Sequence, residues 1–341
     1  MKEFKIPGHY DPSKAGLVYR VDYAGLANQA TAFKKAEGIT NAATDKYKIA
    51  VMPIDMQITF GIPGHELYVQ NAPEDTKRFS EFIYRNLGYI TKIFPTMDTH
   101  TSMQIFHSLF FIDENGDLVK PNTVISSADL KSGKYAVNPA VAGALNVSYT
   151  SLKRHVIHYT ETLEKNGKYS LIIWDYHAML GGIGHALIPL FEEAIFFHTI
   201  ARNSQPGIEI KGGNPLTENY SVLSPEVLNT ADGSSIAQKN ARFIETLLNY
   251  DIVIIGGQAK SHCVAFSIED LLTEIQAKDP ALASKVYLLE DCTSPVIIPN
   301  VIDFTQQGNQ AFKSFESAGM HLVKSITPID QWPGVDTGKL M

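Results

Sequence analysis

Residues 251–272, DIVIIGGQAKSHCVAFSIEDLL, place a cysteine where it could act as a nucleophile. The pattern predicts a strand, a Gly-containing turn and a helix that begins near Cys263. A thiol at a helix N-terminus has its thiolate stabilised by the helix dipole and by free N–H groups, which favours a lowered pKa. The same amides can hold an oxyanion. A buried structural cysteine is the alternative, and position alone leaves both readings open.

Two further side chains could serve this thiol. Asp55 follows a short apolar run, and Lys211 lies at the end of another. A helix cap is the ordinary role of such an aspartate, and a solvated surface charge is the ordinary state of such a lysine. Brought to one sheet edge, however, they form an acid–thiol–ammonium set. The carboxylate can take the thiol proton, and the ammonium can support the thiolate and the leaving group.

A third set of residues could bind a metal ion. The segment DTHTSMQIFH contains Asp98, His100 and His107, and His177 follows later in the chain. The D-x-H pair puts two side chains on one side of an extended segment. One carboxylate with two or three imidazoles suits a divalent metal such as Zn, Mn or Fe. Taken alone, the D-x-H pair is more simply explained by a surface aspartate and a histidine hydrogen-bonded to the backbone.

The elements that must position these residues alternate between short apolar runs and amphipathic stretches. Such alternation implies right-handed βαβ crossovers and a parallel sheet covered on both faces. We therefore expect a three-layer α/β fold in which six strands form a mostly parallel sheet. Seven runs have the character of a strand, one more than the six expected in the sheet: 47–55, 92–100, 169–175, 207–212, 251–257, 285–291 and 321–326. The stretches predicted to be helices include 75–87, 151–164, 183–202, 236–249 and 263–277.

In such a sheet, ligands bind outside the carboxyl ends of the strands. Every reactive residue type named above follows a predicted strand at that edge, which is the strongest indication of function from the residues alone. We expect one α/β domain at 47–330. It would be preceded by an arm or cap at 1–46, carry a turn-rich insertion at 111–144 and be followed by a tail at 331–341.

Composition narrows the functional classes. The 341 residues carry a net charge of −7 and no basic run, which argues against a nucleic-acid-binding protein. Two cysteines make a disulfide framework unexpected. The first residues lack the apolar stretch of a signal peptide, and no 18-residue apolar run predicts a membrane span. We expect a cytoplasmic protein with no membrane partner.

Five segments in order resemble the nicotinamidase branch of the isochorismatase-like cysteine hydrolases, over roughly residues 47–292. They are IDMQITF, DTH with His107, WDYHAMLGGIGHALIP, KGGNPLTENYS and GGQAKSHCVAFS, which resemble the family patterns VDxQxxF, D-x-H…H, WPxHCxxGTxGAxLxP, K-G…D-x-Y-S and GxxxxxCVxxT. Each pattern is weak by itself, whereas five in order are specific.

The resemblance implies a role for each matching residue. It implies catalysis by Asp55, Lys211 and Cys263, a cis peptide bond at Gln258–Ala259, and an oxyanion hole formed by the amides of Ala259 and Cys263. The implied metal ligands are Asp98, His100, His107 and His177, and the implied substrate-binding residues are Phe60, Trp174 and Tyr220. It also implies a small-molecule amide substrate and a homo-oligomer.

The sequence departs from the family pattern in several places. Asp175 replaces the proline two residues before the metal histidine, and Ala178 replaces the cysteine after it. The chain also exceeds compact nicotinamidases by about a hundred residues. We therefore expect an amidohydrolase that releases ammonia through a thioester on Cys263. A carbamoyl, ureido or biuret-like substrate is the alternative, as is a non-catalytic metal-binding protein or, less readily, a thiol redox sensor.

Overall fold

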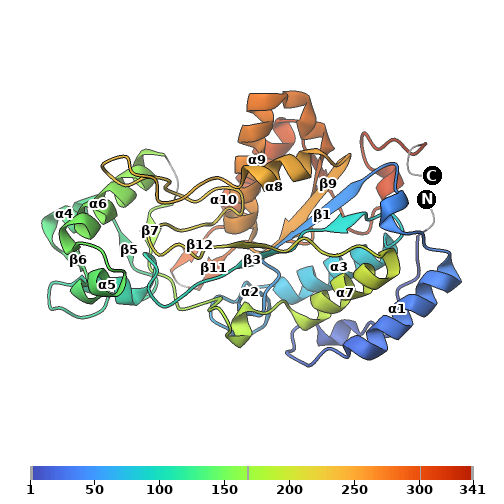
Figure 1. Cartoon of the computed structure of the whole chain (residues 1–341), viewed down its shortest axis with the longest axis horizontal. Helices are drawn as coiled ribbons and strands as arrows, with labels where there is room; N and C mark the ends of the chain where they lie inside the picture. The colour runs from blue at the N-terminus through green and yellow to red at the C-terminus, as the bar shows by residue number, and fades with distance from the viewer. Residues whose placement is uncertain (1–2, 167–168, 300, 339–341) are drawn as a thin grey trace.

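The computed structural model describes residues 3–166, 169–299 and 301–338. At its centre lies a parallel sheet of five strands in the order β13–β10–β9–β1–β2 (Figure 1). All residues of β1 and β9 are buried, as expected for strands covered on both faces. The three-layer α/β prediction is confirmed. The strands are β1 (Ile49–Ile54), β2 (Lys92–Ile93), β9 (Ile252–Gly257), β10 (Val286–Leu289) and β13 (His321–Val323).

The predicted strand at 92–100 is interrupted at Pro95. Its second half, β3 (Thr96–Asp98), pairs in parallel with β8 (Glu209–Lys211). The backbone N–H of Glu209 also donates to the carbonyl of Pro95 at 2.9 Å. β2 and β3 can be counted as one strand interrupted at Pro95. In that case β8, which pairs with β3, is the sixth strand and lies at the edge next to β2 and β3. The continuously hydrogen-bonded sheet has five strands, whereas six were predicted.

The predicted strand at 169–175 does not belong to the central sheet. Only β7 (Leu171–Ile172) forms there, and it pairs antiparallel with β5 (Val124–Ile125). Its side chains are buried in a separate cluster that includes Val156 and Tyr159. An apolar run indicates that a strand is buried but not which sheet it joins, and here the insertion supplies the partner.

Two helical layers cover the central sheet, and β1 shows how its faces are divided. Ile49 and Val51 belong to the core shared with one layer, whereas Ala50, Met52 and Ile54 belong to the core shared with the other. The first layer contains α1 (Tyr23–Glu37), α3 (Ala72–Arg85) and α7 (Pro189–Arg202), and the second contains α8 (Ala241–Leu248), α9 (Ala265–Lys278) and α10 (Thr305–Ser317). The predicted helices at 75–87, 183–202, 236–249 and 263–277 are confirmed, with shifted ends.

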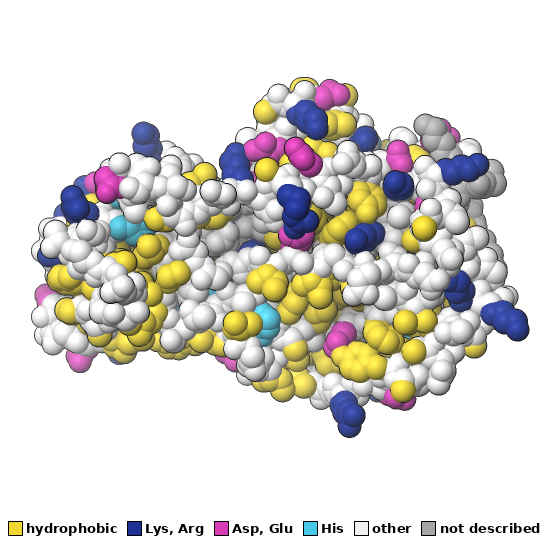
Figure 2. Space-filling model, in the orientation of Figure 1, with side chains coloured by type: hydrophobic (Ala, Val, Ile, Leu, Met, Phe, Trp, Pro, Cys, Tyr) yellow, Lys and Arg dark blue, Asp and Glu magenta, His cyan; other side chains and the backbone are white. Residues whose placement is uncertain are grey.

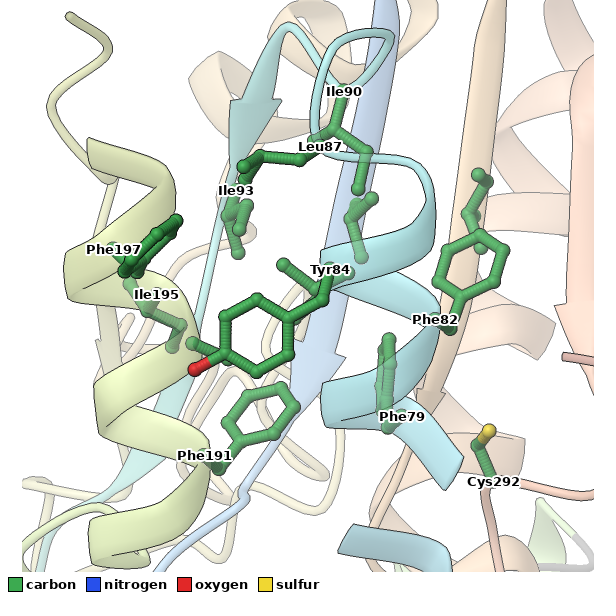
Figure 3. Close-up of a cluster of buried hydrophobic side chains, with 14 of the residues drawn as sticks. Phe79, Phe82, Tyr84, Leu87, Ile90, Ile93, Phe191, Ile195, Phe197 and Cys292 are labelled. Carbon is green, nitrogen blue, oxygen red and sulfur yellow. The ribbon is translucent and has the colours of Figure 1, made fainter. Parts of the chain in front are cut away.

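The core between α3 and α7 is rich in aromatic side chains. Figure 3 shows Phe79 and Tyr84 of α3 facing Phe191 of α7, and the rings of Phe79 and Phe191 lie 5.2 Å apart. Tyr84 contacts Phe197 edge-on at 5.7 Å. Phe79 and Tyr84 are fully buried. Their aromatic contacts hold α3 and α7 together in the helical layer that packs against β1.

The segment between β3 and α7 forms a second lobe, which Figure 2 shows set off from the body by a waist. Lys and Arg side chains are scattered singly over the face in view. The lobe has its own apolar core, which includes Phe110, Phe111 and Leu163. Its elements are β4 (Phe111–Asp113), β5, α4 (Ser127–Ser132), β6 (Tyr135–Val137), α5 (Pro139–Ala144), α6 (Tyr149–Lys165) and β7.

The remaining elements are α2 (Ile58–Gly61), β11 (Ile297–Ile298) and β12 (Ile302–Asp303). Among the described helices, none is both long and apolar enough to cross a membrane.

Candidate active site

Four predicted residues converge where β1, β3, β8 and β9 end. The Nζ atom of Lys211 lies 3.0 Å from Oδ2 of Asp55 and 2.9 Å from Oδ1 of Asp98. The same nitrogen lies 3.5 Å from Sγ of Cys263. A thiol, two carboxylates and an ammonium group are thus in contact, as the placement of these residues at one sheet edge predicted.

Lys211 is held charged by its neighbours. Its side chain is only 2% exposed, and burial alone would favour the neutral amine. The carboxylates of Asp55 and Asp98 outweigh that effect and raise the pKa of Lys211 well above its usual value. Nζ also donates to the backbone carbonyl of Asn219 at 3.0 Å. The ammonium group is therefore fixed in place by three oxygen acceptors.

Asp55 lies directly beyond β1 with a backbone φ of 47°, a left-handed conformation that is uncommon for a residue other than glycine. The Thr96 hydroxyl donates to Oδ1 of Asp55 at 2.6 Å, and the backbone N–H of Asp55 donates to the same hydroxyl oxygen at 3.1 Å. Burial raises the pKa of Asp55, although Lys211 opposes this. A carboxylate with a raised pKa beside a thiol suits a general base.

Cys263 lies in one turn of π-helix, Lys260–Val264, ahead of α9. Burial raises the pKa of this thiol well above its usual value, and the Lys211 ammonium only partly offsets that. The expected lowering at a helix N-terminus is therefore wrong for this environment, because burial and the nearby carboxylates outweigh the dipole. The thiol is protonated at rest and needs a base, which Asp55 can supply.

Asp98, His100 and His177 present one ligand atom each within 4.8 Å of one another. His100 donates from Nδ1 to the carbonyl of Gly212 at 3.0 Å, and His177 donates from Nδ1 to the carbonyl of Asp175 at 2.7 Å. Nε2 of each ring is thereby turned toward Oδ2 of Asp98, at 2.8 Å for His100 and 3.5 Å for His177.

A carboxylate and two imidazole nitrogens that converge in this way fit a divalent cation. Gly212 shapes this cluster, since a Cβ atom there would lie 2.5 Å from the ring of His100 and its φ is +86°. The arrangement of donors and the glycine beside them suit a metal site with open positions.

His107 lies outside this set of three. Its ring centroid is 5.9 Å from those of both His100 and His177, and it packs against Phe106 at 4.8 Å. Burial, with the two imidazoles beside it, lowers the pKa of His107 to about 3. The structure therefore places His107 next to the cluster as a neutral ring.

A cavity of about 280 Å³ opens onto the sulfur of Cys263. Phe60, Trp174, Tyr220 and Ala259, all predicted to contact substrate or the oxyanion, line this cavity. The peptide bond between Gln258 and Ala259 is cis, as the resemblance implied. The walls combine aromatic and aliphatic side chains with polar groups, among them His177 and Cys263.

Several residues that hold this site together were not predicted from the sequence. Gln57 donates from Nε2 to the carbonyl of Asp98 at 2.8 Å, and its Oε1 accepts from the Asp98 backbone N–H at 2.7 Å. Thr96 was also missed, although it lies two residues before Asp98 and so on the same face of the strand. That spacing is the signal that could have found it. Glu218, which accepts from Nε1 of Trp174 at 3.1 Å, had no comparable signal.

No protein-family model matches the sequence, and no curated protein sequence matches it. Solved structures do. The yeast nicotinamidase bound to the inhibitor nicotinaldehyde aligns with a TM-score of 0.50 and 15% identity, over 81% of this chain and 99% of that one. A nicotinamidase/pyrazinamidase of Acinetobacter baumannii aligns at 0.49 and 17%, over 82% and 97%. The N-carbamoylsarcosine amidase of Thermoplasma acidophilum aligns at 0.41 and 14%, over 83% and 99%. The chain therefore has the α/β fold of the yeast nicotinamidase.

Proposed function

We propose that this protein is a metal-assisted cysteine amidohydrolase, which cleaves a small amide to an acid and ammonia through a thioester on Cys263. One observation carries the proposal: Nζ of Lys211 lies within 3.5 Å of the thiol sulfur and within 3.0 Å of two carboxylates. A buried, protonated thiol beside a carboxylate with a raised pKa is a nucleophile with its base. The fold supports the same assignment.

In the proposed reaction, Asp55 takes the thiol proton and the sulfur of Cys263 attacks the amide carbon. The oxyanion is held by the backbone N–H groups of Ala259 and Cys263, and loss of one such donor typically costs on the order of 10²–10³ in rate. The proton on Asp55 passes to the nitrogen as the carbon–nitrogen bond breaks, so that ammonia leaves. Water, deprotonated by Asp55, then hydrolyses the thioester and releases the acid and the thiol.

Asp98, His100 and His177 are the residues that would hold a divalent ion such as Zn, Mn or Fe. Such an ion supplies Lewis acidity toward a ring nitrogen or a water molecule. The support is the donor set itself: both imidazoles donate from Nδ1 to backbone carbonyls, and their Nε2 atoms lie 2.8 Å and 3.5 Å from Oδ2 of Asp98. His107 is proposed as a further ligand, since its ring is 5.9 Å from both imidazoles and neither of its buried nitrogens has a hydrogen-bond partner among the described residues.

A flat pyridine-type amide suits the cavity best. Phe60 and Trp174 line it and would contact the two faces of the ring, each stacked pair being worth ~0.5–1.5 kcal/mol. The yeast enzyme that shares the fold binds nicotinaldehyde, the aldehyde counterpart of such an amide. A carbamoyl or ureido compound is the alternative substrate, and the ammonia-release assay described below tests both classes.

The test is ammonia release from nicotinamide and from carbamoyl and ureido compounds, measured with Cys263→Ala and Cys292→Ala. Both cysteines are buried, but Cys292 lies in the core beside α3 and away from the cavity. We expect Cys263→Ala to abolish turnover while Cys292→Ala retains it. If the Cys263→Ala protein released ammonia at the native rate, the assignment of Cys263 as the nucleophile would be refuted. If the native protein hydrolysed none of these amides, the assignment as an amidohydrolase would be refuted.

A further inference from the structure

The peptide group between Gln258 and Ala259 carries an N–H that the proposed reaction uses to hold the oxyanion. Ala259 lines the cavity and is 6% exposed. In the described part of the chain, neither the carbonyl of Gln258 nor the N–H of Ala259 has a hydrogen-bond partner. An oxyanion hole depends on the direction in which its donors point, and this peptide group has no bond of its own to fix that direction.

The direction therefore depends on the residues beside it. The N–H of Gln258 donates to the carbonyl of Ile54 at 2.8 Å, and the N–H of Lys260 donates to the carbonyl of Ser294 at 2.8 Å. A bond to the N–H of Gln258 alone leaves rotation about its N–Cα bond open. If the side chain of Gln258 is held as well, two of the groups on its Cα atom are fixed, and the third, the carbonyl carbon of the peptide group, is fixed with them.

The side chain of Gln258 is held by a buried carboxylate. Gln258 is 1% exposed, and its Nε2 donates to Oδ2 of Asp75 at 2.9 Å. The side chain of Asp75, on α3, is also 1% exposed, and its Oδ1 accepts from Nη2 of Arg78 at 2.8 Å. Nε of Arg78 donates in turn to the carbonyl of Asp291. The carboxylate thus holds Gln258 on one oxygen while Arg78 offsets its charge on the other.

The same helix contacts Ala259 through apolar groups. Ala72, in the first turn of α3, belongs to a small buried cluster that also contains Phe60 and Ala259. Ala72 and Asp75 are three residues apart and so lie on one face of the helix. This face of α3 therefore supports both ends of the peptide group, with Asp75 on Gln258 and Ala72 in the cluster around Ala259.

We propose that Gln258 and Asp75 are positioning residues, which orient the N–H of Ala259 toward the oxyanion that forms when the sulfur of Cys263 attacks the amide carbon. Neither side chain lines the cavity, so both act through the backbone of Ala259 and not on the substrate. This inference rests on the proposed function and adds to it the residues that set the geometry of its oxyanion hole.

Two reactions of the same sulfur separate positioning from general support of the site. Acylation by an amide builds an oxyanion, whereas thiolation by methyl methanethiosulfonate displaces methanesulfinate and builds none. The experiment measures kcat and KM for nicotinamide, or for whichever amide releases ammonia, and the rate at which the reagent modifies Cys263, followed by mass spectrometry of its peptide. It uses the native protein, Gln258→Met, Asp75→Asn and a control variant.

Asn86→Leu is the matched control. Nδ2 of Asn86 donates to the carbonyl of Phe82 at 2.9 Å, the same distance as in the pair of Gln258 and Asp75. Asn86 is also buried, at 4% exposed, but it lies at the far end of α3 and does not line the cavity. The control therefore loses one buried amide hydrogen bond without a change near the peptide group of Ala259.

We expect Gln258→Met to lower kcat roughly 10–100-fold, as for a misplaced oxyanion donor, while KM and the thiolation rate change by less than about threefold. Asp75→Asn keeps an acceptor but loses the charge, so kcat should fall by only about threefold to tenfold. Asn86→Leu should match the native protein in all three quantities.

The inference would be overturned if kcat in Gln258→Met were no lower than in Asn86→Leu, or if kcat and the thiolation rate fell together, since Gln258 would then only support the fold. The proposed function would still stand. If Gln258→Met does not fold, Asp75→Asn decides by the same comparison. If the native protein hydrolyses no amide at all, the proposed function fails, and the inference fails with it.

Discussion

Replacement of Lys211 by Met removes the positive charge that two buried carboxylates share. Nζ is 3.0 Å from Asp55 and 2.9 Å from Asp98, and the three side chains are 2%, 0% and 6% exposed. Lys239 provides a matched control, because it lies 2.7 Å from Glu274 on the surface with side chains 49% and 33% exposed. The two lysines have similar distances to their partners and differ chiefly in burial.

Burial determines the size of the expected effect. Breaking a buried pair typically destabilises a protein by about 3–5 kcal/mol, because the remaining charge is uncompensated, whereas an exposed pair contributes ~0.2–1 kcal/mol. We therefore expect Lys211→Met to lower the free energy of unfolding by about 3–5 kcal/mol at pH 7, and Lys239→Met by under about 1 kcal/mol. The difference should shrink at lower pH, because burial raises the pKa of Asp55 and protonation removes its charge.

Urea unfolding of both variants, measured with chelator present so that no metal replaces the lost charge on Asp98, gives these free energies directly. If Lys211→Met were no less stable than Lys239→Met, the buried carboxylates of Asp55 and Asp98 would not need Lys211 to compensate their charge. The electrostatic account of the site would then be wrong.

Three further results are expected. Thr96→Val removes the hydroxyl 2.6 Å from the Asp55 carboxylate, so kcat should fall roughly 10–100-fold, as for a hydrogen bond to a charged group, and the acid limb of the pH–rate profile should move to higher pH. Thr91→Val, which removes a comparable bond to Asp45 at 2.7 Å, should leave kcat unchanged, and equal losses in both variants would contradict the assignment. Burial lowers the pKa of His198 from 6.5 to about 4, so the unfolded state binds a proton first as pH falls from 7 to 4, and up to about 3 kcal/mol of stability is lost. Urea titrations should give a shallower pH dependence for His198→Gln, and an identical slope would show that His198 is not the cause. Calorimetry should show zinc binding to the native protein and to His185→Ala but not to His100→Ala, and chelation should lower activity until metal is restored; unchanged kinetics in a metal-free sample would contradict the metal role.

Much of the site could be predicted because its reactive residues follow strands. Asp55, Asp98, Lys211 and Cys263 each come at or just beyond a strand end, and a parallel sheet brings such ends together. The sequence could not show that burial would raise the pKa of Cys263, because that depends on which segments cover the thiol.

Other misses have the same origin in long-range contacts. The run at 169–175 was read as part of the central sheet, but β7 pairs with β5 from the insertion. The role of Gln57 depends on the backbone of Asp98, which lies 41 residues away in sequence. Local patterns specify the elements, whereas partners distant in the chain decide the pairing of short strands and the hydrogen bonds of the site.

The central claim is that the sulfur of Cys263 becomes acylated, and a single-turnover acid quench tests it most directly. Nicotinamide, or whichever amide releases ammonia, is mixed with excess protein, and the quenched samples are digested and analysed by mass spectrometry along the time course. We predict that the peptide containing Cys263 gains and then loses the mass of the acyl group while ammonia appears. Release of ammonia in that first turnover with the Cys263 peptide unmodified at every time point would contradict the account.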